Sequence, residues 1–83
     1  MIDIRKAYEK AKKEAQEHDL ANVKDTGEMW IFIFEKKDKT GRIIPQTPNI
    51  TVNKEDGTLG RLPVPPIENL MIIRSAKEVD FKA

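Results

Sequence analysis

The side chains that could perform chemistry are few in this 83-residue sequence. His18 is the only histidine, Ser75 is the only serine, and cysteine is absent. A serine activated by a histidine could act as a nucleophile, but these two residues lie far apart in the sequence. A zinc site needs several closely placed ligands, which a lone histidine does not supply. We therefore expect no catalytic residue and no metal site.

The carboxylates and glycines also form no recognised site. Residues 53–57 superficially resemble a calcium-binding loop, but Val64 stands where the closing glutamate should be. The four glycines are dispersed and never form a phosphate-binding loop. The sequence therefore predicts no cofactor and no enzymatic activity. One alternative is a small-molecule pocket between the first helix and the sheet, near Tyr8, His18 and Trp30.

Composition limits the partners and the cellular location. The chain has 15 basic and 14 acidic residues with the two signs interspersed, giving a net charge of +1. Such a pattern supplies no field that would attract nucleic acid or an anionic membrane. The sequence has no cysteine, no signal-peptide-like run at its start and no segment of membrane-spanning length. We expect a cytoplasmic protein that binds neither nucleic acid nor membranes.

The elements that would position any site begin with a helix over residues 3–18. Asp3 is suited to cap it, and apolar residues recur at helical spacing on one face. The opposite face carries many charged side chains and is expected to face solvent. Alanines dominate the apolar face, which consists of Ile4, Ala7, Tyr8, Ala11, Ala15 and His18.

Residues 29–34 form the most apolar stretch and predict a strand. Side chains of a strand alternate between its two faces. Trp30, Phe32 and Phe34 share one face, where we expect them to pack against the alanines of the helix. Residues 29, 31 and 33 share the other face. Because both faces are apolar, this strand should be central in its sheet and covered on both sides.

The remaining chain predicts short strands and turns. Residues 20–28 are polar and suit either a loop or an edge strand, and a turn is expected at 39–41. Ile50 and Val52 alternate with polar residues, so their strand should bury one face only. The Asp56-Gly57 dipeptide favours a tight turn into a strand at 58–62. We expect prolines at 45 and 48 to bound an irregular connection, and those at 63, 65 and 66 to end the last strand.

The C-terminal segment, residues 67–83, suits a short helix that starts after Pro66, or another strand, and the helix is slightly preferred. This segment matters because Met29, Ile31 and Ile33 need a cover. Either the segment provides it inside the chain, or a second molecule does. The candidate interaction residues are therefore Met29, Ile31 and Ile33. The intramolecular cover would come from Ile67, Leu70, Met71 and Ile73.

The layout resembles a bacterial pattern. An alanine-rich helix, the aromatic strand at 30–34 and the segment 48–57, which reads PNITVNKEDG, resemble small PepSY-like domains and the related immunity proteins of bacterial polymorphic toxin systems. The resemblance covers residues 3–62 and leaves the C-terminal segment unmatched. It implies a helix packed on an antiparallel sheet, and a cytoplasmic protein that neutralises a toxin by occupying its surface. It assigns no functional residue.

We therefore predict a single α+β domain over residues 1–83. Its N-terminal helix would pack on a three- to four-stranded antiparallel sheet, with the C-terminal segment a short helix or strand. The expected function is that of a non-catalytic protein-binding module, with toxin immunity as its specific form. The alternatives are a homo-oligomeric structural domain, which would bury Ile31 and its neighbours against a second copy, and a small-molecule binder.

Overall fold

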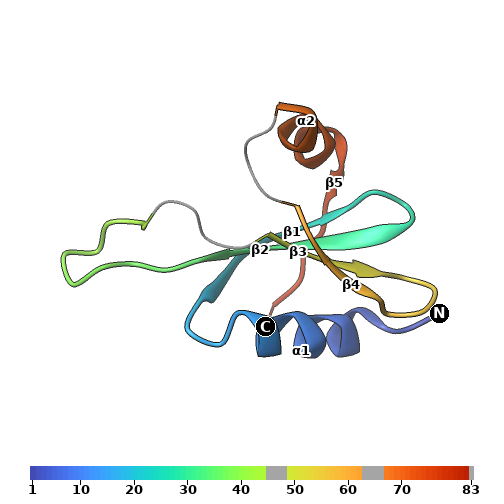
Figure 1. The fold of residues 1–83 in the computed structure, drawn as a ribbon, viewed down its shortest axis with the longest axis horizontal. Helices are drawn as coiled ribbons and strands as arrows, with labels where there is room; N and C mark the ends of the chain where they lie inside the picture. The colour runs from blue at the N-terminus through green and yellow to red at the C-terminus, as the bar shows by residue number, and fades with distance from the viewer. Residues whose placement is uncertain (45–48, 63–66, 83) are drawn as a thin grey trace.

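The computed structural model describes residues 1–44, 49–62 and 67–82. Within them it has two helices and a five-stranded antiparallel sheet of order β4-β3-β2-β1-β5 (Figure 1). The predicted α+β class is confirmed. The helices lie on opposite sides of the sheet. The elements are α1 (Ile4–Glu14), β1 (Asp19–Asp25), β2 (Met29–Glu35), β3 (Asn49–Asn53), β4 (Leu59–Arg61), α2 (Ile67–Ser75) and β5 (Lys77–Glu78).

Helix α1 starts as predicted, because the Asp3 carboxylate accepts a hydrogen bond from the backbone N–H of Arg5 at 2.8 Å. Ala7 and Ala11 are fully buried against the sheet, where small side chains let the helix approach closely. The helix ends at Glu14, earlier than the predicted residue 18. Ala15 leaves the helical region with φ −124°, and its N–H bonds the carbonyl of Lys12 instead.

Strand β2 occupies the centre of the sheet, as its two apolar faces predicted. Trp30, Phe32 and Phe34 are buried in the core beneath α1, and β3 adds Ile50 and Val52 to the same core. The predicted assignment of the aromatic side chains to the helix-covered face is therefore confirmed.

The sheet has one strand, β1, that the sequence did not clearly indicate. Residues 19–25 form β1 between β2 and β5, although their polar composition suited a loop equally well. Val23 is the buried residue of β1, at 1% exposed. The other side chains of β1 remain partly or fully exposed, which explains why the segment lacks a clear apolar alternation.

The β3–β4 connection confirms the predicted turn. Gly57 has φ +74°, a backbone conformation that favours glycine, and its N–H bonds the carbonyl of Asn53 at 2.9 Å. Strand β3 departs from the prediction at one position. Thr51, on the face away from α1, is only 9% exposed, because it lies between Ile31 of β2 and Gly60 of β4.

The C-terminal segment contains both of the predicted alternatives, a helix followed by a short strand. After α2 and β5 the chain crosses the edge of the sheet and ends beside α1 (Figure 1). The Phe81 ring lies 5.4 Å from that of Tyr8 and 6.4 Å from that of Phe32, measured between centroids. The Arg5 guanidinium covers the Phe81 ring at 5.3 Å. These contacts anchor the end of the chain in the core under α1.

Residues 36–44 continue from β2 as a hairpin that projects away from the body of the domain (Figure 1). Lys37 pairs with Ile43, and the N–H of Ile44 bonds the carbonyl of Lys36 at 2.8 Å. The turn predicted at 39–41 is confirmed, and Gly41 has φ +84°. The predictions for the prolines at 45, 48, 63, 65 and 66 lie outside the described residues.

Candidate interaction surface

The residues that suggested chemistry lie apart. His18 follows α1 on one side of the sheet, whereas Ser75 belongs to α2 on the other side. The Ser75 hydroxyl hydrogen-bonds the carbonyls of Met71 and Ile72 within its own helix, at 2.9 and 3.2 Å. Among the described residues, no group of three or more acidic or histidine side chains is placed to hold a metal ion. The structure therefore does not bring Ser75 and His18 together.

The alternative of a small-molecule pocket near Tyr8, His18 and Trp30 stays a prediction. The Tyr8 ring contacts the rings of Phe32, Phe34 and Phe81, so it contributes to the core. An open hollow of about 380 Å³ lies outside Tyr8 and is lined by polar residues of α1 and the turn after it. Neither His18 nor Trp30 lines that hollow.

The predicted interaction residues occupy the sheet face opposite α1. Ile31 is completely buried, whereas Met29 and Ile33 are partly exposed. In the neighbouring strands, Ile31 pairs with Lys24 and Thr51, so polar side chains flank the apolar strip. Ile31 can thus support a contact surface from beneath without touching a partner. The role of Met29, Ile31 and Ile33 in binding stays a prediction.

Helix α2 lies on the same side of the sheet as this strip (Figure 1). Leu70 and Ile73 are half-buried, and no side chain of α2 is fully buried. Ile67 is 71% exposed, Met71 63% and Ile72 38%. We call these three side chains the α2 surface. Helix α2 thus keeps three large apolar side chains exposed.

The sequence did not predict which side chains of α2 would be exposed and which half-buried. It assigned Ile67 and Met71, together with Leu70 and Ile73, to intramolecular cover. Ile67, Leu70 and Met71 are three and four residues apart, a spacing that places them along one side of a helix. Spacing alone therefore did not separate the exposed side chains of α2 from the half-buried ones.

An open hollow of about 460 Å³ separates the C-terminal end of α2 from the β1–β2 turn. Ile72 and Ser75 line its helix side, and Asp25, Thr26 and Gly27 line its turn side. Its remaining lining residues are Ala76 and Lys77. The hollow is open to solvent and lies beside Ile72.

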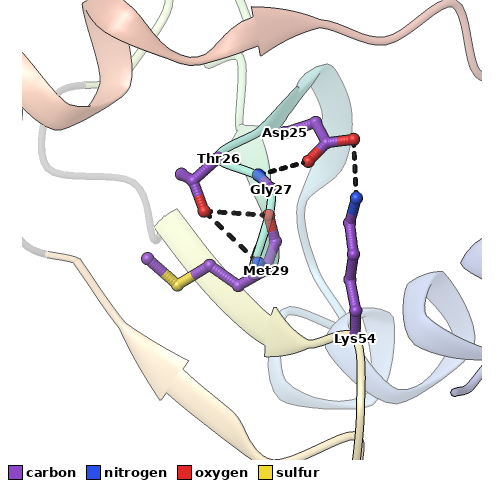
Figure 2. A network of polar contacts seen from close by, with 5 residues as sticks. All are labelled: Asp25, Thr26, Gly27, Met29 and Lys54. Atoms are coloured by element: carbon purple, nitrogen blue, oxygen red, sulfur yellow. Dashed lines mark hydrogen bonds and ion pairs between the residues drawn. The ribbon is translucent and has the colours of Figure 1, made fainter.

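The β1–β2 turn beneath α2 is held by the polar network in Figure 2. The Asp25 carboxylate accepts hydrogen bonds from the Lys54 ammonium at 2.8 Å and from the N–H of Gly27 at 2.7 Å. The Thr26 hydroxyl donates to the carbonyl of Met29 and accepts from its N–H, both at 3.3 Å. These bonds fix the start of β2, which carries Met29.

The same network shifts the pKa of one carboxyl group, that of Asp25. The hydrogen bond from Lys54 and that from the Gly27 N–H together lower the pKa of Asp25 below its ordinary value. The Lys54 ammonium also lies 5.3 Å from the centroid of the Trp30 ring, a favourable cation–π distance. Asp25 is thus occupied in holding β1, β2 and the β3–β4 turn together.

Comparison of the chain with models of protein families, with curated proteins and with solved structures finds no match. Among the described residues, no helix is both long enough and apolar enough to cross a membrane.

Proposed function

We propose that this chain is a non-catalytic protein-binding module whose α2 surface contacts a partner protein. The observation that carries the proposal is the exposure of Ile67 and Met71, at 71% and 63%, side by side on a helix. Large apolar side chains grouped on a surface mark interaction sites. Methionine is especially suited to such surfaces because its flexible thioether adapts to different partners.

The surroundings of α2 fit this role. The helix is tethered at its C-terminal end, because β5 follows it directly and Phe81 is anchored in the core. Leu70 and Ile73 of α2 are half-buried, whereas Ile67, Met71 and Ile72 are exposed to a partner. Met29 and Ile33 can extend the contact along the same face of the sheet.

The specific form that we propose is immunity against a toxin in the cytoplasm. The support is the likeness to PepSY-like domains and immunity proteins of bacterial polymorphic toxin systems, carried by the alanine-rich helix, the aromatic strand and the hairpin at 53–57. In this role the chain would inhibit the toxin by occupying its surface, with no chemistry of its own. Ile67 and Met71 would be the central contacts.

The apolar surface that Met71 would bury on binding sets the size of the effect of replacing it. Removing a large apolar side chain from water contributes about 1.5–3 kcal/mol. Given its exposed fraction of 63%, Met71 can contribute on the order of 1–2 kcal/mol to binding. Because 1.4 kcal/mol is about tenfold in Kd, a Met71→Lys variant should bind its partner roughly 5- to 30-fold more weakly.

The test is affinity capture from cells of the source organism, followed by titration of the purified partner. Met71→Lys should lose the captured protein. Gln16→Lys is the matched control, because Gln16 is exposed beyond the end of α1 and the variant adds the same charge. Equal capture by both variants, or a purified chain that light scattering shows to be a dimer broken by Met71→Lys, would contradict the proposal.

A further inference from the structure

The projecting hairpin at residues 36–44, which we call the basic arm, concentrates positive charge. It carries four cations, Lys36, Lys37, Lys39 and Arg42, against the single carboxylate of Asp38. The whole chain has 15 basic and 14 acidic residues. Without the arm, the rest of the chain has 11 basic and 13 acidic residues. The near-neutral sequence therefore consists of a strongly basic arm on a slightly acidic body.

The one carboxylate of the arm is engaged in its turn. The Asp38 carboxylate accepts hydrogen bonds from the N–H and the hydroxyl of Thr40, at 2.8 and 2.7 Å, and from the N–H of Arg42 at 3.0 Å. These bonds lower the pKa of Asp38, so its charge is retained while it orders the turn. The arm is thus pre-shaped, which lowers the entropic cost of docking.

The outer cations have no partner within the described chain. Lys36, at the base of the arm, forms an ion pair with Glu17 at 3.2 Å. The side chains of Lys37, Lys39 and Arg42 are exposed and form no ion pair among the described residues. Their charge is therefore available to an anionic partner.

The arm also exposes apolar side chains beside these cations. Ile43 is 60% exposed and Ile44 is 38% exposed. Phosphate backbones offer no apolar complement to isoleucine, whereas protein interfaces combine a polar rim with an apolar core. The mixed chemistry of the arm therefore fits a protein better than a nucleic acid.

We propose that the basic arm docks on an acidic protein surface that encloses an apolar patch, with Lys39 and Arg42 meeting carboxylates and Ile43 entering the patch. This inference rests on the proposed protein-binding function, but it uses a surface separate from α2. It specifies the chemistry of the partner: an acidic surface, to which the arm would accelerate association at low salt.

The test measures fluorescence anisotropy with three probes of equal net negative charge. They are a Glu/Leu peptide, a Glu/Ser peptide of the same length and a single-stranded DNA. The Glu/Leu peptide should bind most tightly, and Lys39→Glu with Arg42→Glu should weaken its binding about tenfold at low salt. Lys6→Glu with Lys13→Glu, on the exposed face of α1, is the matched control and should have little effect. Ile43→Ser should abolish the preference for leucine over serine.

Three results would overturn the inference. These are tighter binding of DNA than of either peptide, equal weakening by the arm and α1 variants, and absence of peptide binding at millimolar concentration. Thermal melting of each variant checks that it is folded. Because these probes do not require the α2 surface, Met71→Lys should leave all three affinities unchanged. Failure here is thus distinguishable from failure of the proposed function.

Discussion

Replacing Phe81 by alanine should destabilise the domain and loosen α2, because this side chain anchors the segment after α2 beneath α1. The Phe81 ring is partly buried against Tyr8, Phe32 and the Arg5 guanidinium. Removing a fully buried phenylalanine costs about 3–5 kcal/mol. For a half-buried ring we expect about 2 kcal/mol, including the aromatic contact with Tyr8.

That loss is large for a domain of this size, whose free energy of unfolding should be about 4–12 kcal/mol. Urea denaturation would measure it directly, and the thermal midpoint should fall by roughly 10 °C. Lys82→Ala is the control, because the Lys82 side chain is exposed and only its carbonyl bonds Arg5. A Phe81→Ala variant within about 0.5 kcal/mol of the wild type would refute the anchoring role.

Two further predictions concern the network and the turn beside the N-terminus. Because the pKa of Asp25 is lowered in the folded state, its stabilising contribution is present above the unfolded value of 3.8 and is lost as the pH falls through the folded pKa. Lys54→Met should therefore reduce the loss of unfolding free energy between pH 7 and acidic pH. Urea denaturation at several pH values measures this loss, and an equal loss in the variant and the wild type would contradict the prediction. Gly57→Ala should destabilise more than Gly41→Ala, because both have positive φ but only the Gly57 Cβ would approach Ile2, at 3.2 Å. Equal thermal midpoints for the two alanine variants would contradict this reasoning.

The sequence predicted those elements whose residues themselves determine the structure. The central strand followed from its two apolar faces, α1 from its alanine periodicity and the Asp3 cap, and the β3–β4 turn from Asp56-Gly57. Strand β1 was not clearly predicted, because it buries only Val23 and takes its conformation from pairing with β2. The end of α1 was also missed, since no glycine or proline marks it.

The candidate surfaces were harder to predict because exposure depends on tertiary packing. The sequence indicated that the face of Ile31 needs a cover, but it could not show which side chains of α2 stay exposed. The α2 surface is recognised only from the exposed fractions of Ile67, Met71 and Ile72 in the fold. Likewise, interspersed charges suggested no basic patch, and only the projection of residues 36–44 separates their cations from the acidic body (Figure 1).

Photo-crosslinking from position 71 in cells of the source organism tests the central claim most directly. A photoreactive amino acid would replace Met71 in one variant and Gln16 in the control, and the products would be identified by mass spectrometry. We predict one dominant adduct with a different protein from position 71 and none from position 16. An adduct with a second copy of this chain, or the same products from both positions, would contradict it.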